Sequence, residues 1–264
     1  MKNIITAILI TLALSGCEKV LDLKYKDNKS SLIIEGNITN ESGPYFVKLS
    51  RSVKLTSTGD YPAVDGALVI ISDDAGNTDT LMAKGNGIYQ TNTINGIENR
   101  TYTLVVRVDN EVYTAHSTMP AFVPFDSIKV ETIKVVGDTQ YNLIPVYTDP
   151  VYKGNNYRFV LTVNDKLINQ HFVQQDDVRN GVVNTSRLEI NDDDLELKKG
   201  DTISMEMQCV DDSVALYYKT LALIGDSGPG GGTTPNNPRN NISNGALGLF
   251  SAHTSVYKGV KILF

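Results

Sequence analysis

The segment Thr101–Thr118, with the sequence TYTLVVRVDNEVYTAHST, has the pattern of two β-strands joined by a tight turn. In its first half Leu104, Val106 and Val108 recur at every second position, which places their side chains on one face of a strand. Its centre, Asp109-Asn110, suits the positive backbone angles of a two-residue hairpin turn. The segment therefore predicts an antiparallel β-hairpin with one apolar face turned toward a core.

Strand-length runs separated by turn residues continue on both sides of this hairpin. They lie at residues 31–39, 45–53, 67–72, 78–84 and 88–90 before it, and at 127–135, 141–148, 156–164, 166–173, 185–190, 202–210, 245–252 and 255–264 after it. Regular short strands of this kind predict an all-β protein of the sandwich type. The two prolines of Met119–Asp126 interrupt the pattern, so we expect two β-sandwich domains, at residues 32–120 and 121–264.

One short amphipathic helix is predicted in the second domain, over residues 213–224. Asp211 or Asp212 could cap its start, and Gly225 is suited to end it. Apolar residues recur on it at helical spacing, which indicates a face that packs against a sheet. These residues are Val214, Tyr217, Tyr218 and Leu221.

The helix is followed by a segment rich in glycine and proline. Residues 226–241 read DSGPGGGTTPNNPRNN. Such a composition cannot bury enough apolar surface to order itself unaided. We expect a flexible loop, which is either mobile or ordered by a partner.

The N-terminus has the features of a secretory signal peptide. Lys2 supplies a positive charge, Ile4–Leu14 form an apolar run, and the small residues Ser15 and Gly16 follow. The apolar run is too short to span a bilayer, which takes about 20 residues. We therefore assign residues 1–16 to a signal peptide.

The residue after this signal is a cysteine. Leu14-Ser15-Gly16-Cys17 resembles the bacterial lipobox, in which the cysteine sulfur is joined to a diacylglycerol. Cleavage between Gly16 and Cys17 would leave a lipidated Cys17 as the first residue and anchor the protein to a membrane. The alternative is an ordinary signal peptide with a cysteine nearby by chance.

Residues 17–31 form a polar stretch that we interpret as a tether. Fourteen flexible residues, EKVLDLKYKDNKSS, have a root-mean-square reach on the order of 20 Å. Residue 18 is Glu18 rather than an aspartate that would indicate retention at the inner membrane. We expect attachment to the outer membrane, and the sequence leaves open whether the body faces the periplasm or the cell surface.

Charge and cysteine content narrow the class of protein further. The net charge of −6 argues against binding to nucleic acid, which requires a basic face. Cys209 is the second of only two cysteines, so no internal disulfide can form once Cys17 is acylated. Cys209 follows Ile203, Met205 and Met207 at every second position, which predicts a buried thiol in a core strand.

The sequence nominates no catalytic residue, metal ligand or cofactor site. His116, His171 and His253 are scattered and lack the spacing of a zinc site. There is no G-x-S-x-G nucleophile elbow. Asp192–Asp194 lack the glycine and glutamate that an EF-hand loop requires at later positions, which favours a solvated turn. We therefore expect a protein that is not an enzyme.

Two alternatives remain open at this level. A hydrolase with carboxylates from distant positions leaves no local motif. A glycan- or peptide-binding module is also compatible with the sequence. Such a module often presents flat aromatic side chains, and the chain has 13 tyrosines and no tryptophan.

Residues 32–118 are similar to the transthyretin-like or carboxypeptidase-regulatory-like β-sandwich. The matching segments are DGALVI at 65–70, DAG at 74–76, GIY at 87–89 and TYTLVV at 101–106. In that module a Gly-Ala-x-Val strand, a turn, a G-x-Y strand and a Y-T-L-x-V strand follow in the same order. The resemblance implies a fold and carries no activity.

The whole chain resembles an uncharacterised family of Bacteroidetes-type lipoproteins with a domain of unknown function. The resemblance rests on Cys17 and the tether, and on residues 32–39, 124–128, 237–242 and 245–252. Such proteins are often encoded beside TonB-dependent outer-membrane receptors. This implies an accessory or binding partner of a TonB-dependent nutrient-uptake system, with direct capture of a glycan or peptide as the alternative.

Overall fold

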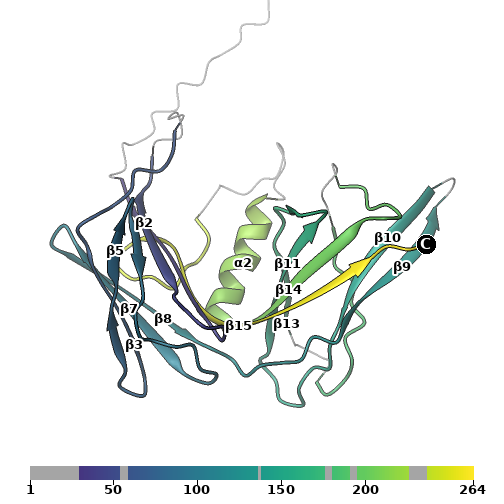
Figure 1. Ribbon diagram of the computed structural model, residues 1–264, viewed down its shortest axis with the longest axis horizontal. Coiled ribbons are helices and arrows are strands. Elements are labelled where there is room, and N and C mark those ends of the chain that lie inside the picture. The colour runs from purple at the N-terminus through teal and green to yellow at the C-terminus, as the bar shows by residue number, and fades with distance from the viewer. Residues whose placement is uncertain (1–29, 54–58, 136–137, 176–179, 191–194, 226–236) are drawn as a thin grey trace, which may run out of the picture.

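The computed structural model describes residues 30–53, 59–135, 138–175, 180–190, 195–225 and 237–264. Its strands form three sheets, and the part of the chain described contains one helix, so the predicted all-β fold of the sandwich type is confirmed. Figure 1 shows an N-terminal half and a C-terminal half with the helix between them. Within these residues no helix combines the length and apolar character needed to cross a membrane.

The N-terminal half contains the first eight strands. They are β1 (Leu32–Thr39), β2 (Phe46–Arg51), β3 (Leu68–Asp73), β4 (Thr78–Thr80), β5 (Met82–Gly85), β6 (Ile88–Gln90), β7 (Thr101–Val108) and β8 (Glu111–Thr118). One sheet has the order β4-β3-β7-β8, and the other includes β1-β2-β6-β5. Apolar side chains from both sheets form one core between them.

The hairpin predicted at 101–118 is strands β7 and β8, which pair antiparallel from Thr101–Thr118 to Val108–Glu111. Leu104 and Val106 are buried as expected. Asp109 and Asn110 both have positive φ, 52° and 62°, which is the conformation that this two-residue turn requires. The prediction from alternation and turn chemistry is confirmed at this element.

The C-terminal half contains the remaining elements. They are β9 (Ser127–Val135), β10 (Asp138–Val146), β11 (Asn156–Val163), β12 (Lys166–Leu167), β13 (Phe172–Gln175), β14 (Thr202–Val210), α2 (Asp212–Gly225) and β15 (Leu247–Lys261). Strands β12, β11, β14 and β15 lie side by side in this order in one sheet, and β13 also pairs with β11. Strands β9 and β10 form a separate hairpin, and β9 supplies Ile128 to the second core.

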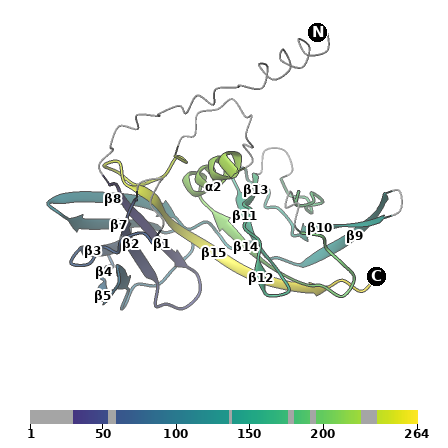
Figure 2. The ribbon, with the colours of Figure 1, turned by 90° about the horizontal axis from the view of Figure 1, so that it is seen from above.

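Strand β15 joins the two halves. We expected two strands, at 245–252 and 255–264, and this prediction was wrong, because one strand of 15 residues runs from Leu247 to Lys261. Its first part pairs parallel with β1 and its second part pairs antiparallel with β14. The sequence His253-Thr254-Ser255 contains no glycine or proline, so nothing forces a turn between the two parts. Both views show this strand, in yellow, crossing from one half to the other (Figures 1 and 2).

Because β15 crosses between the halves, residues on the C-terminal side of the expected domain boundary contribute to the core of the N-terminal half. Phe250 and Ala252 belong to the segment that the sequence placed in the second domain, yet both lie in the core of the N-terminal half. Residues 249–255 are all buried. The two cores are therefore covered by one continuous nine-stranded sheet.

Other differences from the sequence prediction have local causes. Residues 185–190 form no strand, although Leu188 is buried and its N–H donates to the carbonyl of Leu143 at 2.8 Å. The strand expected at 78–84 divides into β4 and β5 at Leu81, whose N–H donates to the carbonyl of Val69. Strands β4 and β5 belong to opposite sheets, so alternation alone could not separate them.

Helix α2 begins one residue before the predicted start and ends at Gly225. Of the two expected caps, Asp211 is the one that acts, since its Oδ1 accepts the backbone N–H of Val214 at 2.9 Å. Its Oδ2 accepts the hydroxyl of Ser117 and the N–H of Thr118 on β8. The cap therefore also ties the helix to the N-terminal half. Residues 226–236 of the predicted loop lie outside the described residues.

We predict that Gly248→Ala lowers the free energy of unfolding by about 2 kcal/mol or more. Gly248 has φ +98°, and a Cβ added there would lie 2.1 Å from the carbonyl oxygen of Ile34 on β1. Both the strain and the clash act at the pairing between β15 and β1. The measurement is the urea midpoint of the two proteins.

Gly259→Ala is the matched control in the same strand. Its added Cβ would meet only the carbonyl oxygen of Ile203, at 3.5 Å, an ordinary contact. We expect a change of less than about 1 kcal/mol for this variant. Equal effects of the two substitutions would show that the close approach of β15 to β1 contributes little.

Candidate functional site

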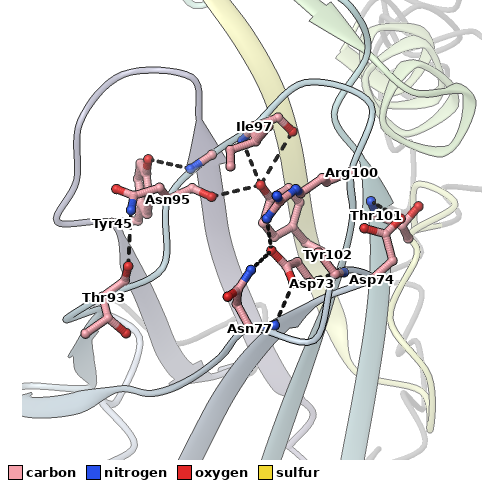
Figure 3. A network of polar contacts seen from close by, with 12 residues as sticks. Tyr45, Asp73, Asp74, Asn77, Thr93, Asn95, Ile97, Arg100, Thr101 and Tyr102 are labelled. Carbon is pink, nitrogen blue, oxygen red and sulfur yellow. Dashed lines mark hydrogen bonds and ion pairs between the residues drawn. The ribbon is translucent and has the colours of Figure 1, made fainter.

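A polar cavity lies at one end of the N-terminal sandwich, between the turn that follows β3 and the segment that leads into β7 (Figure 3). Its volume is about 360 Å³. We call it the Asp73 pocket and define it by its lining residues, Asp73, Asn77, Thr78, Thr93, Ile94, Asn95, Ile97 and Arg100.

Asp73 organises the turn on one side of the pocket. Its Oδ1 accepts the backbone N–H groups of Ala75 and Asn77, and its Oδ2 accepts the side-chain amide of Asn77 at 2.7 Å. Arg100 forms an ion pair with the same Oδ2 at 2.5 Å. Burial alone would raise the pKa of Asp73, but the hydrogen bonds from Asn77 and Arg100 outweigh it and lower the pKa. Asp73 is therefore a fixed anion.

Two buried tyrosines hold the other side of the pocket. The hydroxyl of Tyr102 donates to the carbonyl of Asn95 at 2.8 Å and accepts the N–H of Ile97 at 2.7 Å. The hydroxyl of Tyr45 accepts the N–H of Gly96 at 2.9 Å. Burial raises the pKa of both tyrosines, so both hydroxyls keep their protons at neutral pH. At neutral pH these two hydroxyls therefore hold the segment as neutral donors and acceptors.

Asp79 on β4 fixes the start of the same segment. Its Oδ2 accepts the N–H groups of Asn92, Thr93 and Ile94 at 2.7, 2.7 and 3.1 Å. The residue is only 4% exposed. Burial would raise the pKa of Asp79, but the three backbone hydrogen bonds prevail and lower it. The shape of the pocket thus depends on a second buried carboxylate.

Several polar groups around the pocket have no hydrogen-bond partner among the described residues. They are the hydroxyls of Thr78 and Thr93, the Oδ1 of Asn95 and the N–H groups of Arg100 that Asp73 does not bind. A second cavity of about 340 Å³ shares Ile94 and Asn95 with the first. Neutral amides and hydroxyls beside a paired charge can bind a small polar ligand by hydrogen bonds. Asp73 is already fully hydrogen-bonded, so it is poorly suited to act as a base.

Of the site residues singled out from the sequence, none that the structure describes lines this pocket. Gly16 and Cys17, with the tether up to residue 29, fall outside the described residues, as do Asp192–Asp194. Cys209 is buried in the core of the C-terminal half, as predicted, and burial raises the pKa of its thiol.

The three histidines occupy separate settings. His116 on β8 contacts the hydroxyl of Thr103, and His253 on β15 is buried beside Ser251. His171 precedes β13 and lies against Tyr218 on α2. Within the described part of the chain, no group of three or more His, Cys, Asp or Glu side chains could hold a metal ion.

The gap between the strands expected at 67–72 and 78–84 indicates a turn at residues 73–77, but no sequence pattern indicates the pocket. The Asp73-x-x-x-Asn77 spacing is a usable signal for a side chain that bonds its own turn. No local signal connects this turn to Arg100, which lies 27 residues later.

Fold and site together define an all-β protein of the sandwich type with a polar pocket between loops. The family model described as domain of unknown function (DUF4249) matches residues 18–258, and the chain belongs to this family. A search among curated proteins found no match.

We predict that Asp79→Asn lowers the free energy of unfolding by about 2–3 kcal/mol, because the neutral amide replaces a carboxylate that accepts three N–H groups. The lowered pKa of Asp79 also makes this stabilisation depend on pH. It is present above the unfolded-state pKa of about 4 and is lost as the pH falls through the lower folded-state value. The variant should therefore lose less stability than the wild type between about pH 5 and pH 2. Urea unfolding across that range measures both effects.

Asp74→Asn is the control, because Asp74 is exposed and its carboxylate accepts, among the described residues, only the N–H of Thr101. Its effect should be below about 1 kcal/mol. Two results together would show that Asp79 does not hold the pocket segment. Asp79→Asn would lower the free energy of unfolding no more than Asp74→Asn does, and it would lose as much stability in acid as the wild type.

Proposed function

We propose that this protein is a lipid-anchored, non-enzymatic component of the cell envelope that acts as an accessory of a TonB-dependent nutrient-uptake system. It would be attached to the outer membrane through an acylated Cys17. Its folded body would contact the transporter, and polar sites on that body would bind ligands.

The observation that carries this proposal is the position of Cys17. The lipobox-like Leu14-Ser15-Gly16-Cys17 ends immediately before residue 18, where the family match starts. Acylation at Cys17 would thus place the anchor next to the part of the chain that the family model matches, separated from β1 only by the polar stretch up to residue 31.

The physical chemistry of the anchor supports stable attachment. Each buried methylene of an acyl chain contributes about 0.8 kcal/mol, and a single chain binds only marginally. A diacylglycerol adds two chains at one sulfur, which is enough for lasting attachment. The chain has a net charge of −6, so anionic lipid would not attract it. Electrostatic attraction to the membrane surface therefore could not replace such an anchor.

We predict that Cys17→Ser abolishes lipidation and attachment to the outer membrane. Mass spectrometry of the native protein should find a diacylglycerol on Cys17, and the variant should leave the outer-membrane fraction. After mild crosslinking in cells, the native protein should enrich a TonB-dependent transporter, and the variant should not.

Cys209→Ala is the matched control, because Cys209 is the other cysteine and is buried in the core. It should keep the lipid and the crosslinked partner. An unmodified Cys17 thiol in the native protein would overturn the anchor. A lipidated protein that enriches no transporter would overturn the accessory role alone.

A second candidate function is direct capture of a glycan or peptide. The observation that favours it is the Asp73 pocket, whose free acceptors and hydroxyls belong to Thr78, Thr93 and Asn95. These side-chain groups can form hydrogen bonds with the hydroxyls of a sugar or the amides of a peptide.

We predict that the double substitution Thr93→Val and Asn95→Ala weakens such binding about two- to tenfold, the effect of one or two lost hydrogen bonds. Affinity electrophoresis against polysaccharides, and calorimetry with peptide mixtures, provide the measurement. Thr132→Val on the exposed face of β9 is the control and should bind as the wild type does. Absence of binding to either class of ligand would remove this candidate.

A further inference from the structure

A second polar region lies on the face of the shared sheet that carries α2, in the C-terminal half. We call it the arginine face and define it by Arg158 on β11, Glu206 and Gln208 on β14, His171 before β13, and Tyr218 on α2. Figures 1 and 2 both show α2 beside β11. This face belongs to neither the Asp73 pocket nor the lipid anchor.

The guanidinium of Arg158 is held in a fixed plane. Its carbon Cζ lies 3.9 Å from the centre of the Tyr218 ring, which is a cation–π contact. Its Nη1 donates to the Oε1 of Gln208 at 2.7 Å. Strand pairing sets this second contact, because Arg158 and Gln208 are register partners. The orientation of the charged group is therefore set before any ligand arrives.

One edge of this guanidinium has no hydrogen-bond partner in the part of the chain that the structure describes. The Nε is buried and makes no hydrogen bond, and the Nη2 makes none to any described residue. Buried polar atoms in proteins are almost always paired, so an orphan of this kind calls for an explanation. Nε and Nη2 lie on the same side of the guanidinium, and this side forms two parallel hydrogen bonds with a carboxylate.

Among the described residues, Arg158 has no direct counterion. It forms no ion pair with a described carboxylate. Glu206 is engaged elsewhere, since its Oε1 accepts the hydroxyl of Ser255 at 2.6 Å and the amide of Gln208 at 2.8 Å. Gln208 thus lies between the two charges.

The described groups on the other elements of this face add no anion at the unpaired edge. Burial, and to a lesser extent Arg158 itself, lower the pKa of His171, so this imidazole is neutral at neutral pH. Lys219 on α2 is a further cation, and its ammonium donates to Gln175.

We propose that the arginine face is a binding site for a carboxylate group, which pairs with the unpaired edge of Arg158. The first oxygen would contact Nη2, and the second would approach Nε once the side chains that cover it shift. Such a carboxylate is carried by acidic sugars and by the C-terminus of a peptide. The proposal does not depend on the anchor or on the transporter.

The test uses the full chain, purified in detergent and labelled with ¹⁵N-arginine. Four probes are titrated: glucuronate with glucose as its neutral partner, and N-acetyl-dialanine with its C-terminal amide as neutral partner. The Nε–H resonance of Arg158 should shift with a carboxylate probe and stay in place with its neutral partner. A shift with glucuronate alone identifies an acidic sugar as the source, and a shift with the peptide alone identifies a C-terminus.

Arg158→Lys keeps the charge but removes the planar fork, and calorimetry should show binding weakened at least about tenfold. Tyr218→Leu removes the ring that orients the guanidinium and should also weaken binding. Arg107→Lys, on the exposed side of β7, is the control and should change nothing. If no carboxylate shifts the resonance, if the neutral partners bind equally, or if Arg158→Lys binds as tightly as the wild type, the proposal is wrong.

Discussion

The architecture depends on the pairing of β15 with two partners of opposite direction. Its first part continues the N-terminal sheet beside β1, and its second part continues the C-terminal sheet beside β14. Both pairings require that the strand continues without a break through the junction at His253-Thr254. Seven consecutive residues, 249–255, are buried there, because Phe250 and Ala252 contact one core while Leu249 contacts α2. A strand covered on both faces cannot bend away without exposing apolar surface on one of them.

Side chains from distant segments reinforce that junction. Asn241 bonds the carbonyl and N–H of Phe250 as well as the carbonyl of His116 on β8. Ser117 accepts the N–H of Ala252 and donates to the cap of α2. Strand β15, helix α2 and strand β8 therefore share one set of hydrogen bonds. Through Ser117 and Thr118, the cap of α2 is hydrogen-bonded to a strand of the N-terminal half, although the helix begins only at residue 212.

The sequence could predict what is decided locally. The hairpin at 101–118, the cap and end of α2, and the buried face of Cys209 all follow from spacing and turn chemistry. The continuity of β15 could not be predicted, because alternation does not reveal which strand lies beside Leu247 and which beside Lys261. The sites were missed for the same reason. Arg100 meets Asp73, and Arg158 meets Tyr218, only through contacts between segments far apart in the chain.

The place where the tether enters the fold connects this architecture to the proposed function. The stretch up to residue 31 leads directly into β1, which lies between β15 and β2 rather than at an edge of the sheet. Force or thermal motion transmitted from a membrane anchor would therefore act on a strand hydrogen-bonded on both sides. An edge strand with one neighbour opens at lower free energy than a central strand, so a tether attached to an edge would promote local unfolding. Since β1 pairs with the strand that joins both halves, an anchor at this position would be linked through β15 to the half that holds the Asp73 pocket and to the half that holds the arginine face.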